Sequence, residues 1–359
     1  MGRLLRSKRV LYVAPVVVGL GLLPPVQARA KAIVVLAEAL GLKLPRPFAP
    51  AIARQEIQLD GVTGDLYSHP GQAPPLLLLP GAAPRGKEDP RVIRVATALA
   101  RSDRTVFVPV LELAEKRFVE EDIDRIVRAT EALVAHPSST GGAVVLGFSY
   151  GGSYALIAAA DPRLKDTLES VAVFGAYYDL VGYVQAVTTG ESVIDGERVG
   201  WDGDPRAIEV ARDVGVRLSP PQSRKKLRAA FDGRVSPQEL SPGARATYEL
   251  FTNTDPDKTY ALAEELPSRL KAKLAAFSPA SVSDRITVPV IAIHSTDDPV
   301  VPHGEALRLK QALPRTRLLL VELFRHVNLS AGSPREWLTA LDDFFSLWRF
   351  TSWALSNQE

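Results

Sequence analysis

The nine residues Val145–Ser153 read VLGFSYGGS and carry the strongest structural signal in the chain. Gly147 to Gly151 match the pattern G-x-S-x-G, with Ser149 at its centre. An apolar run precedes the motif and the run YALIAAA follows it, which predicts a strand, a sharp turn and a helix. Small residues around the serine allow the strand and the helix to approach closely at a strained turn. Ser149 is therefore either an exposed nucleophile or an ordinary serine in a glycine-rich turn.

Strands and helices alternate on both sides of this motif. Residues 57–70 predict two short strands around a glycine turn. Apolar runs predict further strands within 74–81, 104–113, 142–149, 168–179, 288–295 and 316–324. Helical periodicity lies between them, within 89–101, 120–137, 150–160 and 304–313, and a last helix is predicted from Ser333. This alternation predicts an α/β fold with a mostly parallel central sheet and helices on both faces.

The alternation stops in the middle of the chain. Residues 181–277 contain three helical patterns, within 220–233, 241–253 and 255–277, and no convincing strand. We therefore expect residues 56–180 and 278–359 to form the sheet domain, with 181–277 inserted as a helical lid. Basic residues of the insertion, such as Lys225, Lys226 and Arg228, are interpreted as a solvated face, so no anionic substrate is inferred from them.

The N-terminus differs from the rest of the chain. An apolar segment from Val10 to Leu23 follows four basic residues, and Ala28–Ala30 offer a small-residue cleavage site. This order predicts that residues 1–30 are a signal peptide for export or, if they are not removed, a membrane anchor. A buried helix in a cytoplasmic protein is the alternative. Residues 31–55 predict an amphipathic leader helix.

Composition excludes several classes of function. The chain has 359 residues and a formal net charge of +2 at pH 7, which gives no electrostatic basis for a nucleic-acid partner. It contains no cysteine, which excludes disulfides, thiolate metal sites and a cysteine nucleophile.

A serine nucleophile needs a base, and the base needs an acid to orient it. Both should follow later strands, in the order serine, acid, histidine. The stretch HSTDDPVVP, from His294, follows one predicted strand, and His326 follows the last one. The other four histidines have local interpretations: His69 and His136 precede prolines, His294 ends a strand and His303 begins a helix.

With these motifs in order, the chain resembles an α/β-hydrolase with a Ser-Asp-His triad from about Ile57 to Phe350. The resemblance implies Ser149 as nucleophile, Asp298 as acid and His326 as base. The adjacent Asp297 is the alternative acid, and Asp179, which follows an earlier strand, is a third. Two departures from the family pattern are Ser295 where glycine is usual and Arg325 before the histidine.

The same resemblance implies an oxyanion hole made of backbone N–H groups. One comes from Tyr150, directly after the nucleophile, and the other from the loop after the strand in 74–81. Ala82 supplies the second N–H, with Ala83 as the neighbouring option. Pro80-Gly81 stands where the family commonly has His-Gly.

These residues predict a serine hydrolase that acts on a small-molecule ester or related acyl compound, with no cofactor and no metal. An acyltransferase would use the same triad, so the sequence does not separate the two. A non-catalytic binding protein of the same fold is the third alternative. Membrane association would depend on the N-terminal segment.

Overall fold

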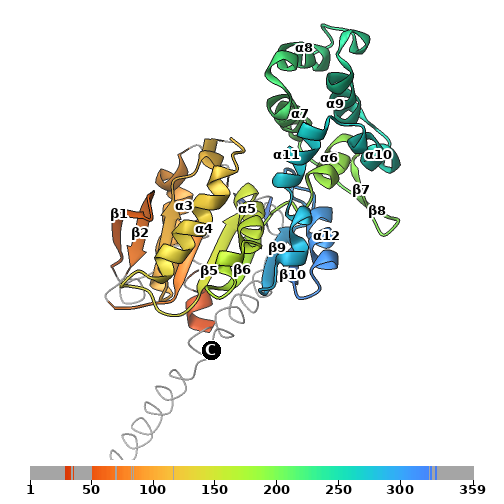
Figure 1. The fold of residues 1–359 in the computed structure, drawn as a ribbon. Coiled ribbons are helices and arrows are strands. Elements are labelled where there is room, and N and C mark those ends of the chain that lie inside the picture. Colours follow the sequence, from red (N-terminus) through yellow and green to blue (C-terminus); the bar gives the residue numbers. More distant parts are fainter. Residues whose placement is uncertain are drawn as a thin grey trace, which may run out of the picture.

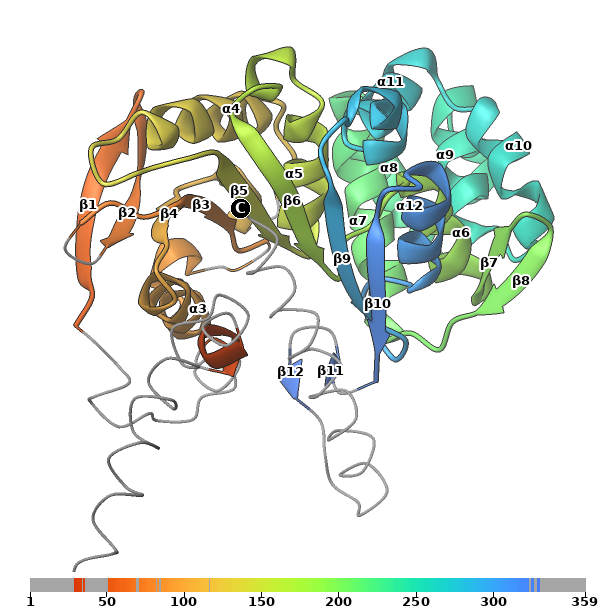
Figure 2. The ribbon, with the colours of Figure 1, turned by 90° about the horizontal axis from the view of Figure 1, so that it is seen from below.

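A computed structural model describes residues 29–33, 35, 51–68, 71–81, 83, 85–115, 117–322, 324–325 and 328–329. Its centre is an eight-stranded sheet (Figures 1 and 2). The strands are β1 (Ala53–Leu59), β2 (Val62–Ser68), β3 (Pro75–Leu79), β4 (Thr105–Pro109), β5 (Ala143–Phe148), β6 (Leu168–Phe174), β9 (Val290–Ser295) and β10 (Arg317–Val321). Two short strands, β11 (Phe324–Arg325) and β12 (Asn328–Leu329), pair separately after β10.

The spatial order of the strands is β1-β2-β4-β3-β5-β6-β9-β10. The strands from β4 to β10 are parallel, whereas β2 is antiparallel to both β1 and β4. The predicted mostly parallel sheet is therefore confirmed. Because β3 lies between β4 and β5, the chain leaves β3 toward one side of the sheet and leaves β5 toward the other.

Helices cover both faces of the sheet, as Figure 2 shows. On one face, Leu76 and Leu78 of β3 pack with α3 (Pro90–Arg101). On the other face, Leu77 and Leu79 pack with α4 (Glu121–Val134) and α5 (Tyr150–Ala159). A strand that is buried on both faces has apolar residues at successive positions, which is why the run Leu76–Leu79 predicts β3 correctly.

Between β6 and β9 the chain forms an assembly of helices beside the sheet (Figure 1). Its members are α6 (Leu180–Thr189), α7 (Arg206–Leu218), α8 (Pro221–Phe231), α9 (Pro242–Thr252), α10 (Thr259–Glu264) and α11 (Ser268–Ala276). After it come β9, α12 (Gly304–Ala312) and β10. Single-turn helices connect several elements: Gly86–Glu88, Glu112–Glu115, Pro162–Leu164, Pro237–Glu239, Pro256–Lys258, Pro279–Ser281 and Ser283–Arg285.

The prediction of no strand in this region is wrong. β7 (Glu191–Ile194) and β8 (Glu197–Gly200) form an antiparallel hairpin. Asp195 and Gly196 connect them with positive φ angles of 51° and 81°. Two such residues make the tight turn that suits two-residue hairpins, and an Asp-Gly pair is its usual sequence signal.

The two ends of the helical insertion meet at the sheet. The Tyr177 hydroxyl donates to the Phe277 carbonyl at 2.8 Å, and the Leu180 N–H donates to Ser278 Oγ at 3.0 Å. The insertion therefore leaves and rejoins the sheet domain at adjacent points.

The sheet begins earlier than predicted. β1 starts at Ala53, so residues 53–55 belong to a strand rather than to the leader helix expected over 31–55. Residues 29–33 and 35 are helical. Residues 1–28 of the signal peptide or anchor predicted over 1–30 lie outside the described residues, as does the helix predicted from Ser333. No helix in the described part of the chain is long and apolar enough to cross a bilayer.

Candidate active site

Ser149 lies at the junction of β5 and α5 with an unusual backbone conformation. Its φ is 51° and its ψ is −129°. Three other non-glycine residues of the described chain have positive φ, and all are aspartates: Asp60, Asp103 and Asp195. Aspartate tolerates the left-handed helical region, but a ψ of −129° places Ser149 outside that region, in a conformation that non-glycine residues rarely adopt. Such a strained backbone persists only where the surrounding structure enforces it.

The glycines around Ser149 let β5 and α5 approach closely. A Cβ atom on Gly147 would lie 2.4 Å from the Gly151 carbonyl oxygen. A Cβ on Gly152 would lie 2.8 Å from the Ala176 methyl group. Real Cβ atoms do not approach other heavy atoms this closely, so the turn requires glycine at these positions.

The loop after β3 packs directly against the same turn. Gly81 has a φ of 68°, and a Cβ there would lie 2.4 Å from the Phe148 carbonyl oxygen and 3.3 Å from Ser149 Cβ. A Cβ on Gly151 would lie 2.6 Å from the Leu79 carbonyl oxygen. Since the chain leaves β3 and β5 in opposite directions, Ser149 stands at the topological switch point of the sheet, where open α/β sheets place their ligands.

Of the two predicted oxyanion donors, Tyr150 is described and Ala82 lies outside the described residues. Tyr150 is the first residue of α5, so its N–H is not used by the helix ladder. Its ring is buried in edge contact with Phe118, with ring centres 5.2 Å apart. The Ala83 N–H donates to the Gly81 carbonyl at 2.9 Å, so this neighbouring option is engaged in the turn.

Asp298 lies in the turn after β9 and is 1% exposed. Its Oδ1 accepts hydrogen bonds from the Val300 N–H at 2.8 Å and the Val301 N–H at 3.0 Å. Its Oδ2 lies 3.7 Å from Nε2 of the buried His294. These contacts fix the orientation of the carboxyl group.

The alternative acids and histidines have other surroundings. Asp297 is exposed, and its N–H donates to Ser295 Oγ at 3.3 Å. Asp179 caps α6 by accepting from the N–H groups of Val181 and Gly182, and its Oδ2 accepts from the Tyr260 hydroxyl. His294 Nε2 is 2.9 Å from the Val301 carbonyl oxygen, the local packing role that was predicted. Burial lowers the pKa of His303.

Backbone hydrogen bonds connect the predicted loops along the carboxyl edge of the sheet. The Ser149 N–H donates to Phe174 of β6 at 2.8 Å, and the Gly175 N–H donates to Ile293 of β9 at 2.9 Å. The Thr296 N–H donates to Val321 of β10, also at 2.9 Å. The turn at Ser149, the loop of Asp298 and the end of β10 therefore all lie along the carboxyl edge of the sheet. His326 lies five positions further on, outside the described residues.

Trp201 supports the loop of Asp298 and was not predicted. Its indole Nε1–H donates to the Asp298 carbonyl oxygen at 2.7 Å, and the Asp204 N–H donates to the Pro299 carbonyl at 2.8 Å. Gly203 lies under the indole, where a Cβ would collide with the ring. A residue just after the hairpin thus holds a loop almost a hundred positions away, which no local pattern could reveal.

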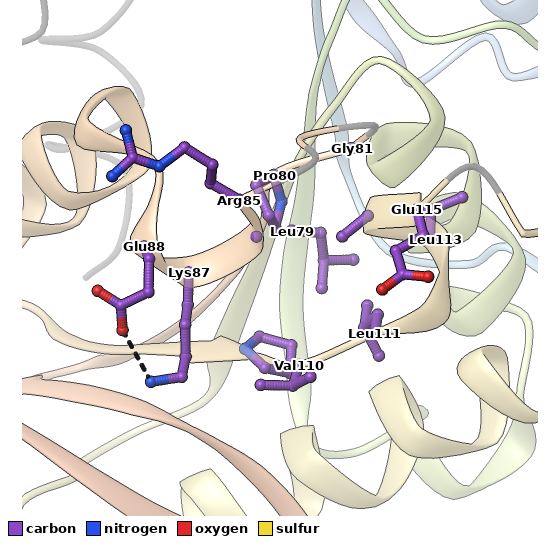
Figure 3. Close-up of a pocket in the computed structure, with 13 residues that line it drawn as sticks. Leu79, Pro80, Gly81, Arg85, Lys87, Glu88, Val110, Leu111, Leu113 and Glu115 are labelled. Atoms are coloured by element: carbon purple, nitrogen blue, oxygen red, sulfur yellow. Dashed lines mark hydrogen bonds and ion pairs between the residues drawn. The ribbon is translucent and has the colours of Figure 1, made fainter.

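A cavity of about 260 Å³ lies beside Gly81 (Figure 3). Apolar side chains of Leu79, Val110, Leu111 and Leu113 line it, and Lys87 pairs with Glu88 at its rim. Gly81 is shared by this cavity and by the turn at Ser149. The geometry provides a small apolar space next to the loop that was predicted to hold the second oxyanion donor.

The carboxyl group of Glu305 on α12 is completely buried behind this edge. Its Oε2 accepts from the N–H groups of Asp179 at 2.7 Å and Tyr178 at 3.0 Å, and Arg308 lies 3.3 Å from Oε1. Burial, and then the negative charge of Asp179, raise the pKa of Glu305 to about 7, against the opposing effects of Arg308 and the N–H groups. Glu305 therefore joins α12 to the start of the helical insertion.

The strand order, the antiparallel β2 and the turn at Ser149 together give the chain an α/β-hydrolase fold. No family model and no curated protein sequence matches it. Solved structures similar to it include the DcsB complex with its substrate analogue, at 14% identity and a TM-score of 0.47 over 84% of this chain and 99% of that one. The α/β hydrolase GrgF from Penicillium sp. sh18 has 16% identity and a TM-score of 0.46 over 84% and 99% of the two chains.

A Pyrococcus furiosus esterase has 12% identity and a TM-score of 0.45 over 85% of this chain and 94% of that one. At these values the similarity concerns the fold alone.

Proposed function

We propose that this protein is a serine hydrolase that cleaves an ester or a related acyl bond of a small molecule. The observation that carries the proposal is the backbone of Ser149, held at positive φ between β5 and α5 and against Gly81. A strained conformation at a sheet switch point is retained where the surrounding structure enforces it, and such strain concentrates at functional sites. The buried, oriented carboxyl group of Asp298 on the same edge adds to this support.

In the proposed reaction, Ser149 Oγ attacks the acyl carbon while His326 accepts the serine proton. The bond from the acyl carbon to the leaving group breaks, and His326 donates the proton to that group. Asp298 orients the imidazole, and the N–H groups of Ala82 and Tyr150 stabilise the negative oxygen that develops. Water then attacks the acyl-enzyme with the same proton transfers, which releases the acid and restores Ser149.

The test is loss of turnover and of covalent labelling in Ser149→Ala. This variant should not hydrolyse p-nitrophenyl esters and should not react with a fluorophosphonate probe, because the attacking oxygen is absent. Ser153→Ala is the matched control: it removes a hydroxyl from the same helix, one that donates to the Tyr177 carbonyl, and should still be labelled. Labelling that persists in Ser149→Ala would refute the proposal.

Hydrolysis and acyl transfer share the acylation step, so product analysis has to separate them. The acyl-enzyme should give mainly the free acid in buffer. A competing alcohol, thiol or amine that captures the acyl group at low concentration would indicate a transferase instead.

We also propose that the N-terminal segment exports or anchors the protein, because four basic residues precede the apolar residues 10–23. N-terminal sequencing of the protein from its native cells tests this. A mature chain that begins near residue 31 indicates cleavage, an intact chain in the membrane fraction indicates an anchor, and an intact chain in the soluble fraction contradicts both.

A further inference from the structure

The exposed face of α8 is strongly basic. Five of its residues, Pro221, Arg224, Lys225, Arg228 and Ala229, line one hollow, and they are spaced as one helical face. Leu227 and Ala230 are the buried residues of the helix. No acidic residue occurs within α8. The basic side chains therefore project together, away from the packed side of the helix.

This hollow has a volume of about 530 Å³ and is completed by α7 and by the turn after α8. Val216 and Arg217 contribute from α7, and Arg234 contributes from the turn. We call these eight residues the α8 groove. It lies at the outer end of the helical insertion (Figure 1). Its volume is within the range of small-molecule sites, roughly 300–1,000 Å³.

Positive charge is in excess in the α8 groove. Arg217 and Arg228 share one carboxylate, Asp213, at 2.6 and 2.7 Å. Arg234 pairs with Asp232, and Arg224 Nε donates to the Ser219 carbonyl oxygen at 2.9 Å. Within the described part of the chain, Lys225 has neither an ion pair nor a hydrogen bond. Five cationic side chains thus face two carboxylates.

We propose that the α8 groove binds a phosphoryl anion. Guanidinium groups present planar, paired N–H donors that match phosphate oxygens, and Lys225 adds a compact charge. Salt bridges to Asp213 hold two of the guanidinium groups in place, which lowers the entropy lost when a ligand binds. The bound group is either a free phosphorylated compound or the headgroup of an anionic lipid. This site is independent of the acyl chemistry proposed for Ser149.

The test compares two neighbouring lysines in the full-length protein. Lys225→Glu places a negative charge in the α8 groove, whereas Lys226→Glu makes the same change on a different face of the helix. Lys226 donates to the Glu239 carbonyl and does not line the groove. Binding of pyrophosphate is measured by calorimetry, and binding to phosphatidylcholine vesicles with and without phosphatidic acid is measured by sedimentation. Thermal unfolding confirms that both variants are folded.

Lys225→Glu should weaken binding about tenfold or more, the loss expected for one charge-assisted contact, while Lys226→Glu should change it by less than about threefold. Saturable pyrophosphate binding with this pattern supports a free phosphorylated ligand. Binding only to vesicles that contain phosphatidic acid, with this pattern, supports a lipid headgroup. Equal losses in the two variants, or no binding to either probe, would overturn the proposal.

Discussion

Ser149 holds a backbone conformation that costs a non-glycine residue about 1–3 kcal/mol. Its neighbours leave little room for relaxation, because Gly147, Gly151 and Gly81 bring backbone atoms of β3, β5 and α5 into direct contact. At this scale the glycines and the serine form one unit: the glycines remove steric bulk, and the serine takes the strained position of the turn, where it is 7% exposed.

The first prediction concerns Gly147. Gly147→Ala should lower the melting temperature by several degrees or more and abolish fluorophosphonate labelling, because the new methyl group meets backbone atoms of Gly151 that cannot rotate away. Differential scanning calorimetry and probe labelling measure both effects. Gly200→Ala, at a glycine with open space around it, should leave both nearly unchanged. A fully stable and labelled Gly147→Ala would contradict the close-packed turn.

The second prediction separates the two adjacent aspartates. Asp298→Asn should reduce kcat/KM for p-nitrophenyl esters on the order of a thousandfold or more, because an amide cannot hold the imidazole in the same way. Asp297→Asn should reduce it only severalfold. Steady-state kinetics on folded variants measures both. The opposite ranking would transfer the acid role to Asp297.

The candidate residues Ser149 and Asp298 could be selected from the sequence because the two stretches that contain them, G-x-S-x-G and HSTDDPVVP, are short and local. Their catalytic roles stay predictions. Trp201 and Glu305 could not be found, because their roles depend on contacts with Asp298 and with the Tyr178–Asp179 backbone, about a hundred or more positions away. Composition and periodicity contain no information about such long-range pairs.

At the scale of elements, α12 fixes the position of α6 through buried polar contacts. Besides the Glu305 contacts, Arg308 Nη2 donates to Gln185 Oε1 of α6 at 2.6 Å, and Arg308 Nη1 donates to the Tyr260 hydroxyl of α10 at 3.1 Å. Sheet domain and helical insertion are thus joined by a network that contains a buried carboxyl group.

This network makes stability depend on pH, which is the third prediction. Since the folded-state pKa of Glu305 is raised above its ordinary value of 4.5 to about 7, the folded protein binds this proton more tightly than the unfolded chain. The resulting stabilisation is complete below pH 4.5 and is lost as the pH rises to about 7, a change on the order of 3 kcal/mol. Urea unfolding across this range measures it, with Glu305→Gln removing the dependence.

Glu197→Gln, at an exposed carboxyl group of the hairpin, serves as the control for this experiment. It should leave the pH dependence of unfolding as it is in the wild type. If Glu305→Gln and the wild type lose stability in parallel from pH 5 to pH 7, the buried carboxyl group is not the source.

Strands and helices were predictable where the hydrophobic periodicity of a segment and its length both indicate the same kind of element. The continuous apolar runs became β3, β4 and β5, since both faces of these strands are covered. The insertion was harder: the pattern over 255–277 gave two helices, α10 and α11, separated at Pro267, and the hairpin at Asp195-Gly196 was missed. Its strands are only four residues long, too short to show an alternating pattern.

At the scale of the whole molecule, apolar packing is divided unevenly. One cluster extends from the sheet into the insertion, from Val145 of β5 to Tyr183 of α6 and Phe251 of α9. A separate small cluster, Val216, Leu227, Ala230, Leu240 and Ala244, holds α8 to its neighbours. The near part of the insertion therefore shares the core of the sheet, and the outer part depends on five buried residues.

The fourth prediction follows for native-state hydrogen exchange. Amides of α6 should open with a free energy close to that of β5, because they share one core, whereas amides of α8 should open at a lower free energy. Exchange measured by mass spectrometry over increasing urea distinguishes these cases. Equal protection of α8 and β5 would show that the outer cluster is not an independent unit.

The overall architecture followed from alternation of strands and helices, but the order of the strands did not. The sequence of β3 does not indicate that this strand lies between β4 and β5 in the sheet. The sequence therefore indicates Ser149 through its motif alone, and the switch point at which it lies is visible only in the structure.

The closed base of the insertion has a consequence for protein engineering. Tyr177 and Phe277, a hundred residues apart, are joined by one hydrogen bond, and the Ala280 N–H donates to the Tyr178 carbonyl at 3.1 Å. Because the two chain crossings are already adjacent, a short linker between them would close without moving β6 or β9. The adjacent crossings thus form a junction for replacing the outer helices of the insertion, whereas α6 has to be kept because it shares the core of the sheet.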